Sequence, residues 1–429
     1  MKTRLYVLVC LVVCLTLGAG ALAAYAEEPT GFVLVEGPTV YEDAKSPTGY
    51  TVTFVYKNDT ATRVQLAGDL ELRDLNDPPA GFPSPGIRYQ PEEWQPGRYH
   101  VGGREFRRDM MYVGEGYWVI SIPMHAGGLS YWYRVWDPAQ GWEDKRIWDP
   151  TSTHPRPPAG FSWRENRNDV LDAVYVPYHE KQNVGHLQIR GTYEIPVADK
   201  QYKGTVQYVE YETILGSKAY LGIYLPAGYD PNREQPYPVL YASHGGNGDE
   251  TDWMIPGNAP NILDNLIARN EIEPTILVTM GNSFISSQED RAKNIAEYVI
   301  PFIEANYNVS QERFGRAYAG FSMGSMLGVT LINNYHELFG YYGFFCARPG
   351  AIDHELLVQT YGEDLPFLMI GNGIFEDQID VYIPIINTLR EAGIPVVYHR
   401  VAGAHDMMTV GQLFTIFGKD YLWKPIQAQ

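Results

Sequence analysis

The clearest chemical signal in the chain is the segment Gly320-Phe-Ser-Met-Gly324. A serine hydroxyl becomes a useful nucleophile only when a neighbouring base takes its proton. Glycines two residues before and two residues after a serine allow a tight turn from a strand into a helix, which presents the serine at the helix N-terminus. Residues 316–319 predict that strand, and residues 326–332 predict that helix. The pattern predicts that Ser322 is a nucleophile.

The base that such a serine needs is best matched by His405. In an α/β-hydrolase the histidine follows the nucleophile in the chain. His405 lies in the small-residue segment Ala402-Gly-Ala-His-Asp406, directly after a strand predicted over residues 396–401. Because a loop after a strand can bring its side chain back to the serine turn, we predict that His405 takes the proton of Ser322.

The carboxylate that orients the histidine is expected between the serine and the histidine, in the loop after another strand. Residues 366–370 predict that strand, and three carboxylates follow it: Glu376, Asp377 and Asp380. We favour Asp377 as the acid, and Glu376 and Asp380 stay open as alternatives.

A second glycine-rich segment, Ser243-His-Gly-Gly-Asn-Gly248, follows a strand predicted over residues 237–243. Glycines let backbone N–H groups approach a substrate closely. Such groups, together with the N–H of the residue after the nucleophile, can stabilise the negative charge that develops on a reacting carbonyl oxygen. We therefore predict an oxyanion hole made by Gly246 and Met323.

No metal or cofactor is predicted. The acidic residues Asp69, Asp74, Asp77 and Asp249 lack the spacing of a metal-binding loop. The chain also has no phosphate-binding GxGxxG or Walker sequence.

The elements that must position these residues alternate between strand and helix from about residue 200 onward. This alternation is typical of a parallel sheet covered by helices on both faces. Together with the order serine, acid, histidine, it predicts an α/β-hydrolase catalytic domain over residues 200–429.

Residues 27–155 have a different pattern, with short segments rich in branched and aromatic residues and bounded by turn residues. This pattern predicts an all-β sandwich. Prolines between residues 150 and 158 indicate a domain boundary, and residues 156–199 are predicted to be a linker and connecting segment. We expect residues from about 190 onward to fold and act on small esters without the sandwich.

Residues 1–26 are predicted to be a secretory signal peptide, with Lys2 and Arg4 before an apolar run and a small-residue exit at residues 24–26. The protein is then expected to be secreted or periplasmic. Only Cys346 remains after cleavage, so no intrachain disulfide can form, which is typical of a bacterial export product.

The charge balance limits the classes of partner. The chain has 33 basic and 51 acidic residues, a net charge of −18. Nucleic acids and anionic membranes bind clustered positive charge, so neither is an expected partner. The oligomeric state is left open.

Six segments resemble the esterases of carbohydrate esterase family 1, which include feruloyl and acetyl-xylan esterases, and enterochelin-esterase-type proteins. The matching segments are residues 224–230, 236–246, 249–253, 298–304, 319–324 and 403–406. The resemblance covers about residues 200–423 and implies a secreted serine esterase, with Ser322 and His405 as nucleophile and base. Ser325 departs from the pattern, because the family usually has a glycine there.

The resemblance also implies a substrate, most directly a feruloyl or acetyl ester on plant xylan. In that interpretation Trp253, which follows the glycine-rich loop, is a possible substrate-binding residue at the mouth of the site. The alternative that Trp253 packs beneath the loop stays open. Hydrolysis of a siderophore ester or of small esters in general is a second possible activity.

The N-terminal region resembles the immunoglobulin-like E-set modules that often precede such esterases. The similar segments are residues 64–69, 116–118, 131–133 and 148–150. Such modules are sometimes glycan-binding, so a non-catalytic glycan-binding protein is a third hypothesis. Intact Ser322 and His405 argue against it.

Overall fold

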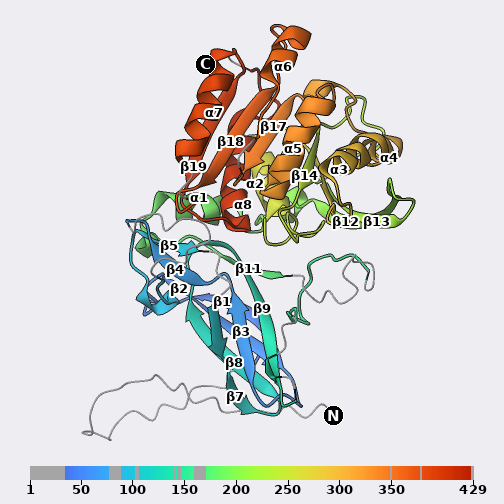
Figure 1. Cartoon of the computed structure of the whole chain (residues 1–429). Coiled ribbons are helices and arrows are strands. Elements are labelled where there is room, and N and C mark those ends of the chain that lie inside the picture. Colours follow the sequence, from blue (N-terminus) through green and yellow to red (C-terminus); the bar gives the residue numbers. More distant parts are fainter. Residues whose placement is uncertain are drawn as a thin grey trace, which may run out of the picture.

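The structure is a computed structural model of the 429-residue chain. It describes residues 34–76, 88–101, 106–139, 141–142, 146–158, 171–347, 350–376 and 379–426. Figure 1 shows two parts, a β-sandwich near the N-terminus and a sheet with helices on both faces toward the C-terminus. The predicted signal peptide, residues 1–26, lies outside the described residues. Within the described ranges, no helix combines the length and apolar character that crossing a membrane requires.

Two antiparallel sheets form the sandwich. The first has the strand order β1-β2-β8-β7, and the second has the order β10-β9-β3-β6, with β11 also pairing with β9. Their bounds are β1 Gly37–Glu42, β2 Tyr50–Lys57, β3 Val64–Gly68, β6 Phe106–Asp109, β7 Met111–Gly114, β8 Tyr117–Pro123, β9 Gly127–Asp137, β10 Gly141–Trp142 and β11 Asp172–Val176. Alternate residues face inward, as Phe54, Leu66 and Tyr133 do, so the aromatic and branched residues of these strands form one core.

The sandwich extends further along the chain than predicted. Strand β11 falls within residues 156–199, the segment predicted to be a linker, and pairs antiparallel with β9 over its whole length. Its inward residues Val174 and Val176 join the sandwich core. The proline-rich segment therefore connects two strands of the sandwich, β10 before it and β11 after it. The connection to the second part begins only after Val176.

A separate hairpin lies at the end of the sandwich nearest the second part (Figure 1). It consists of β4 (Glu71–Asp74) and β5 (Arg98–Val101), which pair antiparallel with each other. Between the sandwich and the second part lies α1 (Gly185–Tyr193), flanked by the short helices η2 (Glu180–Gln182) and η3 (Lys200–Tyr202). Another short helix, η1 (Pro91–Glu93), precedes β5.

The second part contains an eight-stranded sheet with the order β12-β13-β15-β14-β16-β17-β18-β19. The strands are β12 Thr205–Glu212, β13 Lys218–Leu225, β14 Val239–Ser243, β15 Ile276–Met280, β16 Arg316–Phe321, β17 Tyr341–Phe345, β18 Phe367–Gly373 and β19 Val396–Val401. The β12–β13 hairpin is antiparallel, β13 pairs antiparallel with β15, and the strands from β15 to β19 are parallel. This topology is that of an α/β-hydrolase, so the predicted fold class is confirmed.

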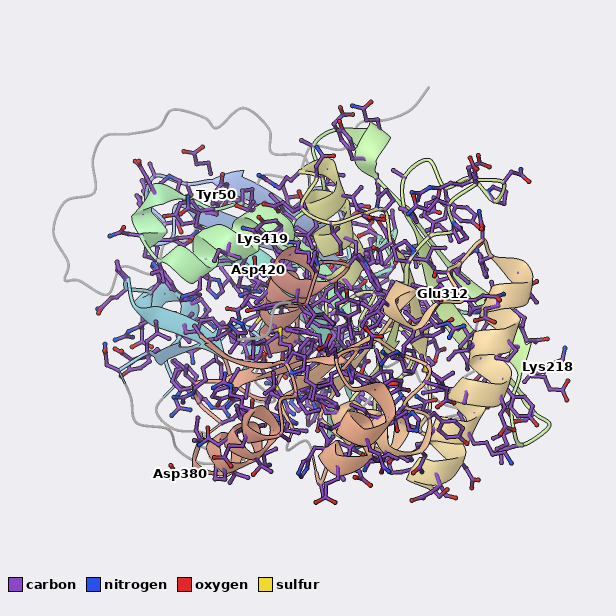
Figure 2. The ribbon with its side chains drawn as sticks, turned by 90° about the horizontal axis from the view of Figure 1, so that it is seen from above. Tyr50, Lys218, Glu312, Asp380, Lys419 and Asp420 are labelled. Carbon is purple, nitrogen blue, oxygen red and sulfur yellow. The ribbon has the colours of Figure 1, made fainter. Side chains whose placement is uncertain are left out.

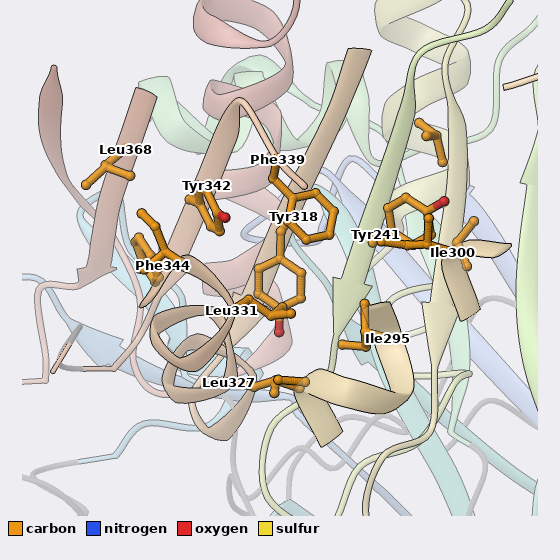
Figure 3. Packing of buried hydrophobic residues seen from close by; sticks show 14 of the residues in the cluster. Tyr241, Ile295, Ile300, Tyr318, Leu327, Leu331, Phe339, Tyr342, Phe344 and Leu368 are labelled. Atoms are coloured by element: carbon orange, nitrogen blue, oxygen red, sulfur yellow. The ribbon is translucent and has the colours of Figure 1, made fainter. Parts of the chain in front are cut away.

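Helices cover both faces of this sheet. One face carries α3 (Gln288–Asn294), η4 (Ile295–Val299), α4 (Ile300–Asn306), α5 (Met323–Asn334), α6 (His354–Tyr361) and α7 (Ile379–Glu391). The other carries α2 (Ala259–Ala268), α8 (Met407–Ile416) and η6 (Phe417–Tyr421), and η5 (Arg313–Gly315) precedes β16. Figure 3 shows the first face, where Leu327 and Leu331 of α5 pack near Tyr318. Strands buried on both sides have no polar face, as in β14, where all five residues are buried.

Candidate active site

The Ser322 turn has the strained geometry that the sequence predicts. Ser322 stands between β16 and α5 with φ of +52° and ψ of −110°. A non-glycine residue in this region stores roughly 1–3 kcal/mol of strain. A Cβ on Gly320 would clash with the backbone of Gly324, and one on Gly324 would clash with the carbonyl of Ser243. Both glycines are therefore required by close backbone packing.

Two hydroxyl groups bond to the backbone of this turn. The Ser325 hydroxyl lies 2.6 Å from the carbonyl oxygen of Gly320 and 2.9 Å from that of Phe345, within hydrogen-bonding reach of both. The Tyr318 hydroxyl donates to the carbonyl of Gly324 at 2.7 Å. Ser325, where the resembled family usually has a glycine, thus ties α5 to the ends of β16 and β17.

His405 lies beside the serine, as predicted. Its Nε2 is 3.0 Å from the Ser322 hydroxyl oxygen, and its Nδ1 is 2.6 Å from Oε1 of Glu376. A carboxylate only accepts hydrogen bonds, so Nδ1 carries a proton and donates a hydrogen bond to Glu376. Nε2 then accepts from the Ser322 hydroxyl. The Phe321 ring packs against the imidazole at a centroid distance of 4.9 Å.

The residue facing Nδ1 is Glu376, which the sequence argument kept as an alternative to the favoured Asp377. The backbone N–H of Glu376 donates to the Gly373 carbonyl at 3.1 Å, closing a turn directly after β18. This turn points the Glu376 side chain inward, where it is 2% exposed and its Oε2 accepts from the Gly373 N–H at 2.9 Å. Asp377 lies outside the described residues. Asp380 is exposed at the start of α7, on the rim of the molecule in Figure 2.

Cys346, which the sequence argument noted only as a lone cysteine, lies against the same carboxylate. It follows β17 with a left-handed φ of +55°, and it is 2% exposed. Burial raises the pKa of the Cys346 thiol, and the charge of Glu376 raises this pKa further. The thiol therefore stays protonated and offers its S–H to Glu376. The sequence argument missed this contact, because the position of Cys346 depends on a positive φ, which the sequence does not display.

The glycine-rich loop packs directly against the Ser322 turn. A Cβ on Gly245 would lie 3.3 Å from the Ser322 Cβ, and one on Gly246 would lie 3.2 Å from the Met323 sulfur. Gly246 and Met323 are both exposed. The two predicted oxyanion residues thus face each other beside the serine.

His244 has a structural place in that loop. Its Nδ1 is 2.6 Å from the Gly245 carbonyl, and its Nε2 accepts from the Asn282 N–H at 3.0 Å. The first contact lies within the loop, and the second holds the loop to the segment after β15. No group of three or more potential metal ligands is assembled among the residues described by the structure.

Trp253 does not line the site, contrary to its predicted role. It is 1% exposed and belongs to the core between the sheet and the helices α2 and α8. Its ring meets Phe414 edge-on at 5.7 Å and lies 6.2 Å from Phe345. The segment after the glycine-rich loop turns inward because its largest apolar side chain is buried there. No indole surface is left for a substrate.

Comparison with known proteins relates part of the chain to esterases. Residues 213–354 match the sequence profile of the family described as "Putative esterase". This region includes the glycine-rich loop and the Ser322 turn, and it ends before Glu376 and His405. The predicted resemblance to esterases is thereby confirmed for this part of the chain.

Two curated relatives are larger proteins. An endo-1,4-beta-xylanase/feruloyl esterase from Xylanibacter ruminicola is 29% identical over 214 residues, covering 42% of this chain and 30% of that protein. Endo-1,4-beta-xylanase Y from Acetivibrio thermocellus is 34% identical over 135 residues, covering 29% of this chain and 12% of that protein. The chain thus spans less than a third of the length of either relative.

Solved structures with similarity to this chain include two esterases. The feruloyl esterase module from Clostridium thermocellum, complexed with sinapinate, is 21% identical with a TM-score of 0.45, covering 56% of this chain and 94% of its own. The enterobactin esterase from Shigella flexneri is 14% identical with a TM-score of 0.48, covering 92% of this chain and 97% of its own.

Proposed function

We propose that the protein is a serine esterase in which Ser322 is the nucleophile, His405 the base and Glu376 the orienting acid. The observation that carries this proposal is the continuous pair of contacts from Ser322 Oγ through the imidazole of His405 to the buried Glu376 carboxylate. A nucleophile, a base within hydrogen-bonding reach and a third group that orients the base are the parts that acyl transfer needs.

In the first half of the reaction, His405 Nε2 takes the proton of the Ser322 hydroxyl as its oxygen attacks the ester carbonyl carbon. The carbonyl oxygen becomes negative, and the N–H groups of Met323 and Gly246 stabilise this charge. The tetrahedral intermediate then collapses, the bond to the alcohol oxygen breaks, and His405 delivers its proton to the leaving alcohol.

In the second half, His405 takes a proton from water, and the water oxygen attacks the acyl-Ser322 carbonyl. Collapse of the second intermediate breaks the bond to Ser322 Oγ and releases the carboxylic acid. Glu376 holds Nδ1–H throughout and stabilises the imidazolium that forms in each half.

The substrate class we propose is a feruloyl or acetyl ester carried by plant xylan, hydrolysed outside the cell after export by residues 1–26. The names of the xylanase/feruloyl esterase relatives support this class. The buried position of Trp253 removes the aromatic contact that would have favoured ferulate over acetate. The acyl preference therefore has to be measured.

A substrate panel with purified protein tests the proposal. Methyl ferulate, acetylated xylan, 4-nitrophenyl acetate and a catechol siderophore triester should be compared for the unmutated protein and for Ser322→Ala. Turnover of the xylan-type esters that is lost in Ser322→Ala supports the proposal. Preference for the siderophore ester would reassign the substrate, and no turnover of any ester above background would overturn the esterase assignment.

A further inference from the structure

The sandwich hairpin β4–β5 lies against the edge of the α/β sheet where the parallel strands end, which is the edge that carries Ser322, Glu376 and His405 (Figure 1). Tyr99 of β5 is fully buried, although it belongs to a two-stranded hairpin at the margin of the sandwich. It forms a small cluster with Phe375, and Ile374, Ala402 and Ala404 pack against that cluster. The hairpin therefore covers the two catalytic loops directly.

On the acid side, the contact is with the residue immediately before Glu376. The Tyr99 and Phe375 rings have centroids 6.3 Å apart, and the Arg73 guanidinium of β4 lies 4.1 Å from the centre of the Phe375 ring. Phe375 is 4% exposed, and its backbone N–H donates to the Gly403 carbonyl at 3.1 Å. Phe375 thus links the acid loop, the histidine loop and the hairpin.

On the histidine side, the contact runs through the Tyr99 hydroxyl. It accepts a hydrogen bond from Gln412 Nε2 at 2.7 Å, and the same amide donates to the Ala402 carbonyl at 2.9 Å. A Cβ on Gly403 would lie 3.2 Å from the Tyr99 hydroxyl oxygen, so the backbone leading to His405 passes directly over this group. Met408, three residues after His405, belongs to the sandwich core.

The hairpin itself is held from behind. The ring of His186 in α1 lies 5.0 Å from that of Tyr99. At the end of α1, Arg190 and the following Glu194 form a fully buried ion pair that binds both backbone polar groups of Gly128 in β9, its N–H and its carbonyl. The Glu194 carbonyl in turn accepts a hydrogen bond from Asn261 of α2 at 2.9 Å, so this segment connects the sandwich to the hydrolase part and the hairpin can act as a rigid support.

We propose that the N-terminal sandwich is a structural part of the catalytic machinery, with Tyr99 as a positioning residue that holds the Glu376 and His405 loops in register. This proposal rests on the proposed esterase function. Glu376 and His405 follow different strands, and productive catalysis requires their side chains to keep their geometry within about 0.5 Å. Tyr99 touches both loops and none of the reacting groups.

This role also bears on the expectation that residues from about 190 onward act alone. A chain without the sandwich would expose Phe375 and Met408, which are 4% and 2% exposed in the full protein. It would also leave the Gln412 amide without its Tyr99 acceptor.

The test compares Tyr99→Phe with Tyr133→Phe in the full-length protein. Both tyrosines are fully buried in the N-terminal part, and Tyr133 donates to Asp149 at 3.1 Å, away from the catalytic loops. We expect Tyr99→Phe to lower kcat by about tenfold, the scale of one hydrogen bond, with KM nearly unchanged. Tyr133→Phe should leave kcat unchanged. Both substitutions should lower the melting temperature by similar amounts.

A second readout separates positioning from general stability. The hydrogen bond between His405 Nδ1 and Glu376 should lengthen in Tyr99→Phe and stay constant in Tyr133→Phe. The NMR chemical shift of the His405 Nδ1 proton measures this without substrate, so it distinguishes failure of this proposal from failure of the esterase assignment. Gln412→Met should reproduce the effect, and the double variant should lose no more than either single variant.

Equal behaviour of Tyr99→Phe and Tyr133→Phe in kcat and in the chemical shift of the His405 Nδ1 proton would overturn the proposal. If Tyr99→Phe does not fold, Gln412→Met against Tyr133→Phe carries the same comparison.

Discussion

The Ser322 turn and the two loops that carry Glu376 and His405 are built in different ways. The turn is supported by its own neighbours, since Gly320, Gly324 and Ser325 pack or bond within the strand–turn–helix unit and against the two strands beside it, β14 and β17. The loops are supported from outside the sheet, by a hairpin of the sandwich. The hydrogen bond between Tyr99 and Gln412 joins residues 313 positions apart.

This difference means that substitutions can lower activity in two ways. A change in the turn alters the nucleophile directly, through local backbone geometry. A change in the hairpin leaves the nucleophile in place and alters how well the acid and histidine are aligned with it. Substitutions in the two regions should therefore have different kinetic signatures.

The largest effect is expected from Ser322→Ala, which removes the nucleophile and leaves the turn intact. Loss of such a residue costs about 10⁴ to 10⁶ in turnover. The melting temperature should stay within a few degrees of that of the unmutated protein, because the hydrogen bond that the hydroxyl loses is to a half-buried side chain, that of His405. Turnover of 4-nitrophenyl acetate is the measurement, and near-native activity with contamination excluded would refute the nucleophile assignment.

Glu376→Gln should follow, with a loss of order 10⁴ in kcat, because an amide can hold the imidazole in the wrong tautomer. Asp377→Asn is the matched control, since it makes the same chemical change one residue later in the same loop. It should keep most of the activity. If Asp377→Asn were the more damaging of the two, the acid would be the residue that the sequence argument favoured.

Ser325→Ala tests the local support of the turn and should have a smaller effect. It removes the buried hydroxyl beside the carbonyls of Gly320 and Phe345, of which the Phe345 carbonyl still accepts from the Ser322 N–H, so we expect a cost of roughly 0.5–1.5 kcal/mol of unfolding free energy. Thr330→Ala, in the same helix, removes a hydroxyl bonded at 3.5 Å near the surface and should cost little. Chemical denaturation of both variants gives the comparison, and equal stabilities would argue against this role for Ser325.

The smallest effect at neutral pH, and a growing one in acid, is expected from two histidines at the boundary between the parts. Burial lowers the pKa of His125 to about 3 and that of His186 to about 4. Between pH 6.5 and these values the unfolded chain binds protons that the folded chain does not, so stability falls as the pH falls. Above pH 6.5 both side chains are neutral in either state and the effect vanishes.

Denaturation between pH 7.5 and 4 measures this trend, and His186→Phe, which keeps a ring against Tyr99 and cannot take a proton, should reduce the slope. An unfolding free energy that does not change over this range would contradict the proposed linkage.

Part of the molecule was predictable because its signals are local. The strand, the turn and the helix around Ser322 occupy one continuous segment, and only glycine tolerates the backbone contacts at positions 320 and 324. Alternation of strands and helices likewise predicted the α/β-hydrolase sheet. The contribution of β11 to the sandwich was missed, because a short strand after a proline-rich segment gains its stability from pairing with a distant strand, β9.

Two features could be read from the sequence alone. The tight turn at Ser322 follows from the steric requirement for glycine at positions 320 and 324, and the fold class follows from the alternation of strands and helices. The role of His405 stays a prediction. Only the tertiary structure places the Glu376 carboxylate beside His405, because the turn that the Glu376 N–H closes with the Gly373 carbonyl sets the direction of this side chain. It also decided that Trp253 is core, because the space between α2, α8 and the sheet exists only once those elements have packed. For the same reason, no local pattern could place the sandwich residue Tyr99 beside the catalytic loops.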